Sequence, residues 1–357
     1  MTARFPKAEI PEVHLHGLAT AVPAHELDQS VVEVRAAKIL GPRFPAFARM
    51  RKTFGTAGVE MRYSVAPLDW FEGETDWADR NNRYLDGATA LFIDAAAKAL
   101  ADAGWQGADI DIIVTISSTG IATPTLEARA KSDLGFRDDC LRVPVFGLGC
   151  AGGVSGMSVA RELALAQPGA RVLLVVVETC SLSFQSDKPR KADIIATVLF
   201  GDGAAAACLS TDETPIRIGR GVTKTWPDTL PIMGWDVGDH GMGVIFDRSI
   251  PDFTHAEFRG ALDAALTASD LTLDSLDRLV CHPGGAKVVD AMERASDLTP
   301  GSLDHERETL RHYGNMSAPT VLFVLERALD AGQTGQLLTC ALGPGFSAAF
   351  QPLYVRS

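Results

Sequence analysis

The chain has 357 residues, of which 46% are hydrophobic and 22% are charged, and this composition indicates a globular protein with a large core. Its formal net charge of -12 excludes a general basic surface, so we expect no nucleic-acid partner. The longest clear apolar run, residues 172–177, is too short to cross a bilayer, so we expect no integral membrane segment.

The cysteines and the first ten residues favour a reducing, cytoplasmic location. The six cysteines form no Cys-x-x-Cys motif and fit no zinc spacing, and a chain of this length needs no disulfide framework. We therefore expect no metal site and several thiols in the core. Residues 1–10 contain Pro6 and Glu9 and lack an apolar stretch, so no signal peptide is predicted.

The first half of the chain alternates strands with helices. We expect strands over residues 11–21, 110–116 and 171–178, a strand from Val143 into the turn at Cys150, and an alanine-rich strand after Gly203. Helices are predicted over residues 24–60 (mainly helical), 82–103, 126–134, 157–166 and 192–199. Residues 64–80 and 117–124 are expected to be irregular. The run over 171–178 is apolar throughout, which is typical of a central strand that is covered on both faces.

The second half repeats this alternation after a boundary predicted at residues 211–215. We therefore expect two domains, residues 1–214 and 215–357. Strands are predicted over residues 216–223, 279–281, 337–342 and 346–355, helices over 255–268, 287–296 and 320–331, and a loop over 226–235. This order indicates an α/β protein built in layers.

Cys150 lies in a glycine-rich turn between a predicted strand and a predicted helix. The unpaired N–H groups of a helix N-terminus favour a thiolate, and the flanking glycines allow a ligand to approach closely. These features are typical of an activated sulfur nucleophile. The structural alternative is a buried thiol with no reactive role, and the turn by itself does not decide between the two.

His282 and Asn315 lie in comparable turns of the second half. An imidazole can sustain a thiolate, and histidine and asparagine can both donate hydrogen bonds to a developing enolate or oxyanion. Each residue also has a structural alternative, because His282 could be a loop histidine and Asn315 could cap the following helix. Together with Cys150 they indicate a site for nucleophilic catalysis.

Five motifs, in a characteristic order along nearly the whole chain, carry a family resemblance. They are residues 149–153 (GCAGG), 199–206 (LFGDGAAA), 282–287 (HPGGAK), 313–317 (YGNMS) and 343–345 (GPG). The chain resembles the type III polyketide synthases of the chalcone/stilbene synthase superfamily. The resemblance implies a thiolase-like fold, layered α-β-α-β-α from two similar halves, and a homodimer.

The resemblance also implies roles for single residues. Cys150 would carry the acyl chain, and His282 and Asn315 would stabilise the enolate formed when malonyl-CoA loses carbon dioxide. Phe200 would be a gate between the CoA tunnel and the reaction chamber, where an aromatic wall disfavours the malonyl carboxylate. CoA thioesters would be the substrates, with no metal, flavin or nicotinamide cofactor.

A local cluster of cations resembles the region that grips the CoA phosphates in this family. Arg49, Lys52 and Arg62 are the candidates, and Gly284, Gly285 and Lys287 would lie at the CoA entrance. The structural alternative for the basic cluster is a solvated helix face.

Residues 62–70, 119–124, 178–184 and 233–236 resemble bacterial members that make alkylpyrones or alkylresorcinols from fatty acyl-CoA starters. Small side chains are expected to leave room for a long chain in the chamber, which would be lined by Thr119, Thr123, Cys180, Ser183, Gly343, Pro344 and Gly345. Thr123 would lie on a loop that reaches into the partner subunit, before a cis peptide bond to Pro124. Packing alone is the alternative explanation for the small residues.

Two other functions stay open for the sequence. One is a β-ketoacyl-acyl-carrier-protein synthase that performs a single condensation and also uses a Cys-His-Asn set. The other is an inactive thiolase-fold subunit that only binds a partner. The sequence leaves undetermined the starter length, the number of extensions, the mode of ring closure and whether an acyl carrier protein delivers the starter.

Overall fold

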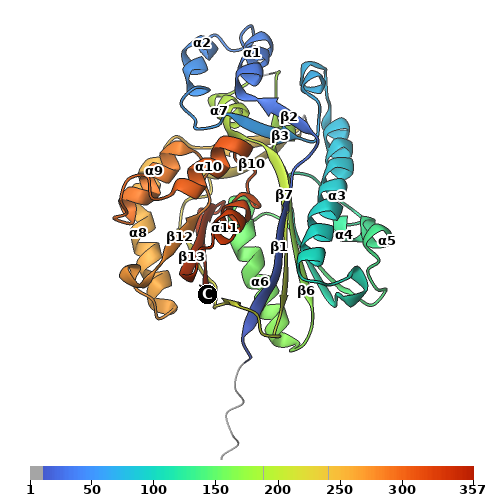
Figure 1. Cartoon of the computed structure of the whole chain (residues 1–357). Helices are drawn as coiled ribbons and strands as arrows, with labels where there is room; N and C mark the ends of the chain where they lie inside the picture. The colour runs from blue at the N-terminus through green and yellow to red at the C-terminus, as the bar shows by residue number, and fades with distance from the viewer. Residues whose placement is uncertain (1–10, 188, 240) are drawn as a thin grey trace, which may run out of the picture.

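A computed structural model describes residues 11–187, 189–239 and 241–357 (Figure 1). The signal-peptide prediction rests on residues 1–10 and so lies outside the described residues. The main sheet has the strand order β12-β13-β14-β8-β1-β7-β6-β4-β5, with β9 paired to β14. In the described parts of the chain, no helix combines the length and the apolar character needed to traverse a bilayer.

The strands of the first half form one end of this sheet. They are β1 (Val13–Ala21), β4 (Ile112–Ile116), β5 (Leu141–Val145), β6 (Val172–Thr179) and β7 (Asp202–Ser210). The helices of this half are α1 (Gln29–Leu40), α2 (Phe47–Met50), α3 (Trp77–Asp102), α4 (Leu126–Arg129), α5 (Lys131–Leu134), α6 (Gly152–Ala166) and α7 (Lys191–Leu199). A small separate sheet pairs β2 (His25–Asp28) with β3 (Met61–Ser64).

The strands of the second half form the other end. They are β8 (Ile216–Ile218), β9 (Val222–Thr225), β12 (Arg278–Cys281), β13 (Gly335–Gly343) and β14 (Ser347–Val355). The helices are α8 (Ile250–Ala268), α9 (Ala286–Ala295), α10 (Asp304–Tyr313) and α11 (Thr320–Asp330), and β10 (Met233–Gly238) pairs with β11 (Gly241–Phe246) in a hairpin of its own. Strand β8 pairs with both β1 and β14, so the sheet continues from one half into the other.

The helices and strands form five layers, as expected. Figure 1 shows α3 outside the strands β1, β6 and β7, with α6 and α11 between these strands and β12 and β13, and with α8 and α9 on the far side. Three apolar clusters fill the spaces between the layers. Strand β6 shows how alternation builds them, because Leu173, Val175 and Val177 pack under α3 while Leu174 and Val176 face α6.

Several elements differ from the sequence-based predictions. Helix α10 and the strand pairs β2–β3 and β10–β11 were not predicted, and the predicted helix over 126–134 is divided into α4 and α5. Helices α6 and α8 begin about five residues earlier than the apolar periodicity indicates, at Gly152 and Ile250. The earlier start of α6 places Cys150 in the turn of 3-10 helix that leads directly into this central helix.

Candidate active site

Cys150 is held in a tight turn between two segments that are far apart in the chain. The turn Gly149–Ala151 precedes α6, and Gly149 has a φ of 47°, a conformation that favours glycine. A Cβ atom on Gly149 would lie 2.7 Å from the Pro344 side chain, and one on Gly343 would lie 2.6 Å from the Ala151 Cβ. The predicted turn Gly343-Pro344-Gly345 therefore packs directly against the turn that carries the cysteine.

Ser317 is the residue whose side chain hydrogen-bonds to the Cys150 sulfur. Its Oγ donates to Sγ over 3.4 Å, and both groups are buried. Ser317 has a φ of 61°, and its N–H donates to the Asn315 Oδ1 over 2.8 Å, which fixes the turn between α10 and α11. Ser317 belongs to the motif at residues 313–317, but no role was predicted for it, because serine in a turn carries no specific signal.

Asn315 connects this turn to the segment of His282. Its Nδ2 donates to the Gly284 carbonyl oxygen over 3.1 Å, and the Gly284 N–H donates to the His282 carbonyl oxygen over 3.1 Å. A Cβ atom on Gly284 would be 3.7 Å from the His282 Nε2, so the imidazole lies over this turn. A continuous series of contacts therefore brings the segments of Cys150, Asn315 and His282 together.

The His282 imidazole has a free hydrogen-bonding capacity inside the protein. Neither Nδ1 nor Nε2 has a hydrogen-bond partner among the described residues, although both are buried. Unpaired buried polar atoms are rare and costly, so they point to a place where a ligand supplies the missing partner. Burial lowers the pKa of His282 to about 3, which keeps the imidazole neutral at pH 7.

Burial of Cys150 acts against the thiolate that we expect at a helix N-terminus. Burial raises the pKa of the Cys150 thiol to about 11, against the smaller lowering effect of the Ser317 hydroxyl. Enclosure by the surrounding protein favours the neutral form of both groups. Burial therefore favours the neutral thiol of Cys150 and the neutral imidazole of His282.

Phe200 is tied to Asn315 through the main chain. The Asn315 N–H donates to the Leu199 carbonyl oxygen over 2.7 Å, and the Gly201 N–H donates to the Asn315 carbonyl oxygen over 3.0 Å. The partly exposed Phe200 side chain lines a cavity together with Cys180 and Ser183. The predicted gate residue therefore lies beside the predicted chamber residues.

Arg62 does not have the phosphate-binding role that we predicted. Its side chain is only 3% exposed, and its two terminal nitrogens donate to the main-chain oxygens of Thr197, Val198 and Phe200 and to the Gln29 side chain. Burial lowers the pKa of Arg62 to about 9, so it stays charged at pH 7. Arg62 thus supports the segment that carries Phe200 and offers no free terminal N–H group to a phosphate.

The other predicted CoA-binding residues lie on two neighbouring surfaces. Arg49 and Lys52 are exposed on α2 and the 3-10 turn after it, and Lys287 is exposed on the first turn of α9. Gly58, which follows the basic segment, lies so close to α9 that a Cβ atom there would be 3.4 Å from the Ala286 Cβ. Within the described residues, the Arg49, Lys52 and Lys287 side chains have no acidic partner.

The predicted chamber residues Thr119 and Cys180 surround a carboxyl group, Glu178, to which the sequence analysis gave no role. Its Oε2 accepts from the Ser118 N–H over 2.9 Å and from the Thr119 Oγ1 over 2.8 Å, while Oε1 has no partner among the described residues. Burial raises the pKa of Glu178 to about 8, and the carboxyl group interacts electrostatically with the Cys150 thiol. Its signal in the sequence was a single acid at the end of an apolar strand.

The hairpin β10–β11 closes another side of this region. The Trp235 Nε1 donates to the Ser118 carbonyl oxygen over 2.7 Å. Trp235, Gly241 and Met242 line a second pocket with Thr119 and Ser183. Thr123 lies apart from these residues because its side chain is exposed in the single chain, and the predicted cis peptide bond to Pro124 is present.

Comparisons with known proteins place the whole chain in one family. Profiles of the chalcone and stilbene synthase N-terminal and C-terminal domains match residues 70–213 and 221–353. The chain is 38% identical over 344 residues to a 1,3,6,8-tetrahydroxynaphthalene synthase of Streptomyces peucetius subsp. caesius, which covers 93% of this chain and 90% of that protein. The chain belongs to the type III polyketide synthases.

Further similarities agree with this membership. The type III polyketide synthase described here is 31% identical over 350 residues to a putative chalcone synthase of Bacillus subtilis, covering 93% of this chain and 95% of that one. Its fold matches the solved structure of the Streptomyces coelicolor A3(2) 1,3,6,8-tetrahydroxynaphthalene synthase with a TM-score of 0.91, at 27% identity and over 96% and 99% of the two chains. The thiolase-like fold and the acyltransferase class are therefore confirmed.

Proposed function

We propose that this type III polyketide synthase builds its product on Cys150. The contact series from Cys150 through Ser317 and Asn315 to the His282 turn is the observation that carries this proposal. In the first step the Cys150 thiol passes its proton to the neutral His282 imidazole as its sulfur attacks the starter thioester. The imidazolium then protonates the departing CoA thiolate.

His282 and Asn315 then serve the malonyl-CoA decarboxylation. Their N–H groups hold the thioester carbonyl oxygen, so that the electrons released by the departing carbon dioxide form a stabilised enolate. The enolate carbon attacks the acyl carbon of the Cys150 thioester, and the Cys150 sulfur leaves as a thiolate. This thiolate then attacks the lengthened CoA thioester, which returns the chain to Cys150 and releases CoA. The buried, unpartnered nitrogens of His282 support this assignment.

We propose that the CoA moieties bind between α2 and the start of α9. Arg49, Lys52 and Lys287 have exposed cationic groups without acidic partners in the described residues, and phosphates are suitable counter-ions for them. Gly284 and Gly285 leave the adjoining turn free of side chains. The substrates would be the CoA thioesters themselves, with no separate cofactor.

The starter that we propose is a fatty acyl-CoA, and the product is an alkylpyrone or alkylresorcinol. A mainly apolar cavity, open to solvent on one side, extends from Cys180, Ser183 and Phe200 to the side chains of α1. Its far wall consists mainly of Leu27, Val32, Ala36, Ile39, Leu68 and Phe71. Such a lining suits an alkyl chain, because burying methylene groups is favourable and requires no polar partners.

The similarity to a tetrahydroxynaphthalene synthase favours a second product class. A naphthalene ring with four hydroxyl groups carries no alkyl chain, so its assembly requires no long starter. The apolar cavity beside Cys180 would then have no alkyl chain to hold. We therefore rank this product behind the alkyl-substituted ones.

We also propose a homodimer in the cytoplasm. Strand β5 is the edge strand of the main sheet, and the apolar side chains Ile121, Leu141 and Phe146 are about half exposed around it. An apolar edge strand invites pairing with a second copy of the chain, which would also bring Thr123 to the partner. The free state of all six cysteines supports a reducing compartment.

The test incubates the purified protein with isotope-labelled malonyl-CoA, alone and with a panel of acyl-CoA starters, and identifies products by mass. We expect an alkylpyrone or alkylresorcinol that contains several malonyl-derived units and one long starter. Formation of tetrahydroxynaphthalene from malonyl-CoA alone would refute the alkyl-substituted product and support the second product class. Addition of a single malonyl unit would instead indicate the single-condensation synthase.

The Cys150→Ala variant is the control for the nucleophile. Removing one sulfur from the turn should leave the fold intact and abolish product formation, because no acyl-enzyme can form. A variant that still makes the full product would remove Cys150 from the proposed mechanism.

A further inference from the structure

Strand β12 reaches the active site as the outer edge of the sheet, and an edge strand has N–H groups that no neighbouring strand satisfies. Along such a strand, successive residues direct their main-chain groups to opposite sides. The His282 N–H points inward and donates to the Cys340 carbonyl oxygen of β13 over 2.8 Å. The Cys281 N–H therefore points outward, where no strand lies.

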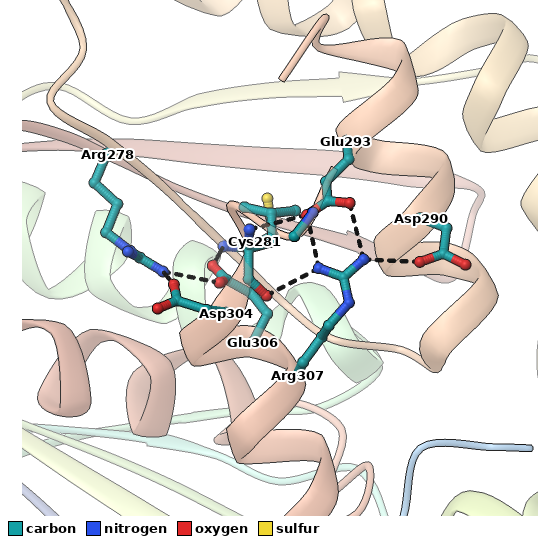
Figure 2. A network of polar contacts seen from close by, with 9 residues as sticks. Arg278, Cys281, Asp290, Glu293, Asp304, Glu306 and Arg307 are labelled. Atoms are coloured by element: carbon teal, nitrogen blue, oxygen red, sulfur yellow. Dashed lines mark hydrogen bonds and ion pairs between the residues drawn. The ribbon is translucent and has the colours of Figure 1, made fainter. Parts of the chain in front are cut away.

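A carboxyl group from α10 replaces the missing strand at this position. The Cys281 N–H donates to the Glu306 Oε1 over 2.8 Å, and the Glu306 side chain is completely buried (Figure 2). Arg278 holds the other oxygen of Glu306 over 3.2 Å and also contacts Asp304 over 2.9 Å. Burial raises the pKa of Glu306 to about 7, and the group can accept from the Cys281 N–H in either protonation state.

Helix α10 connects the segments of His282 and Asn315, the two residues that are proposed to stabilise the enolate. Glu306 lies in its first turn, against the residue before His282, and the helix ends at Tyr313, two residues before Asn315. Figure 2 also shows Arg307 of α10 joined to α9, where its guanidinium contacts Asp290 over 2.8 Å and Glu293 over 2.6 Å. The helix is thus fixed to both segments that flank the turn of His282.

We propose that Glu306 is a positioning residue that sets the place of the His282 imidazole relative to Asn315. It does so by fixing the last peptide of the edge strand to the helix that carries Asn315. The inference rests on the proposed role of His282 in decarboxylation. Glu306 itself does not contact the substrate, since it lies on the outer side of β12.

Loss of the acceptor has a definite consequence. The buried Cys281 N–H would be left without a partner, and the end of β12 would shift to satisfy it. Such a shift moves the imidazole with the main chain, whereas the CoA-binding cations on α2 stay in place. The turnover number should therefore fall while KM for malonyl-CoA changes little.

The experiment measures carbon dioxide release from malonyl-CoA by the full-length enzyme and by matched variants. Glu306→Met keeps the length of the side chain but removes the acceptor, and its kcat should fall roughly 10- to 100-fold with little change in KM. Glu306→Gln keeps an acceptor oxygen, so its kcat should stay within about threefold of the wild type. Asp304→Asn, which alters only the exposed contact of Arg278, is the control for that ion pair.

The outcomes separate the inference from the function on which it rests. Equal kcat values for Glu306→Met and the wild type, or equal losses in the Met and Gln variants, would overturn the positioning role. If Glu306→Met does not fold, Glu306→Asp tests the positioning role. This variant keeps the charge beside Arg278 but moves the acceptor away by the length of one methylene group, so its kcat should fall. His282→Ala is assayed in parallel, and an unchanged rate in that variant would instead refute the proposed function.

Discussion

At the scale of single residues, the candidate active site contains buried polar atoms without partners. Both ring nitrogens of His282 and the Oε1 of Glu178 are unpaired among the described residues, and the Glu178 carboxyl group interacts electrostatically with the Cys150 thiol. A protein interior normally pairs such atoms. These atoms are therefore available to bond to a substrate or to water.

The buried Glu178 predicts a specific dependence of stability on pH. Its pKa rises from 4.5 in the unfolded chain to about 8 in the folded one, so the folded state holds the extra proton between these values. Stability from this group is complete below pH 4.5 and is lost as the pH rises through 8. Between pH 6.5 and 8.5 we expect the free energy of unfolding to fall by about 2 kcal/mol on account of Glu178.

Glu178→Gln is the variant that isolates this effect. Glutamine keeps an acceptor for the Ser118 N–H and does not titrate, so its free energy of unfolding should depend less on pH over the same interval. Urea unfolding at pH 6.5 and pH 8.5 measures the difference. Identical pH dependence in the variant and the wild type would contradict the raised pKa.

The sequence predicted the three reactive side chains but not the residues that adjust them. Cys150, His282 and Asn315 lie in glycine-rich turns whose motifs are distinctive, and the structure brings their segments together. Ser317 and Glu306 act through contacts with residues distant in the chain, which no local pattern reveals. The prediction for Arg62 was wrong because a cation in a basic stretch is usually exposed. Its carbonyl partners lie 135 to 138 residues away in the chain, so the local sequence does not reveal them.

At the scale of secondary-structure elements, the polar character of a segment decided what could be predicted. Helix α10 buries only Glu306, Thr309 and Leu310, so its sequence has no apolar stripe of helical period. The strands β2 and β3 have four residues each, too few to establish an alternation. Strand β6 was predicted well because it is apolar throughout and is covered on both sides.

The element that carries Phe200 depends on Arg62 for its shape. Replacing Arg62 by methionine removes the donor to the carbonyl oxygens of Thr197 and Phe200 and to the Gln29 Oε1, whereas the Val198 oxygen keeps the Gln29 Nε2. Because each buried unsatisfied group costs about 1–3 kcal/mol, we expect the free energy of unfolding to fall by at least about 3 kcal/mol. Denaturant unfolding measures this loss.

Arg49→Ala is the matched comparison from the same basic stretch. Its side chain is exposed, so the stability should change by less than about 0.5 kcal/mol, while KM for malonyl-CoA should rise. A normal KM in this variant would argue against phosphate binding by Arg49. A stable Arg62→Met protein would contradict the supporting role of Arg62.

At the scale of the whole molecule, the five layers place the reactive turn at the start of a helix between the two halves of the sheet. Helix α6 lies between the two halves of the sheet and begins two residues after Cys150. Its glycines allow close packing, since a Cβ atom on Gly153 would lie 2.3 Å from the Ala318 carbonyl oxygen. The nucleophile therefore lies at the start of a closely packed helix in the centre of the molecule.

The proposed dimer can be tested at the same scale. Phe146 is 59% exposed next to the edge strand β5, so Phe146→Asp should convert a dimer into a monomer of half the mass in sedimentation analysis. We expect product formation to fall as well, because Thr123 would no longer reach a partner. Leu230→Asp, which alters a side chain that is 76% exposed elsewhere, should leave the mass unchanged. A wild-type protein that sediments as a monomer would refute the dimer.

The hairpin β10–β11 has a consequence for redesigning this enzyme. It forms a two-stranded sheet outside the main one, and its Trp235 nitrogen donates to the oxygen of Ser118 beside the chamber. Replacing this hairpin by hairpins from homologues would thus change one wall of the proposed reaction chamber. The Cys150 thiol and the His282 imidazole would stay unchanged. A small library of such chimaeras offers a route to new ring systems on an unaltered catalytic frame.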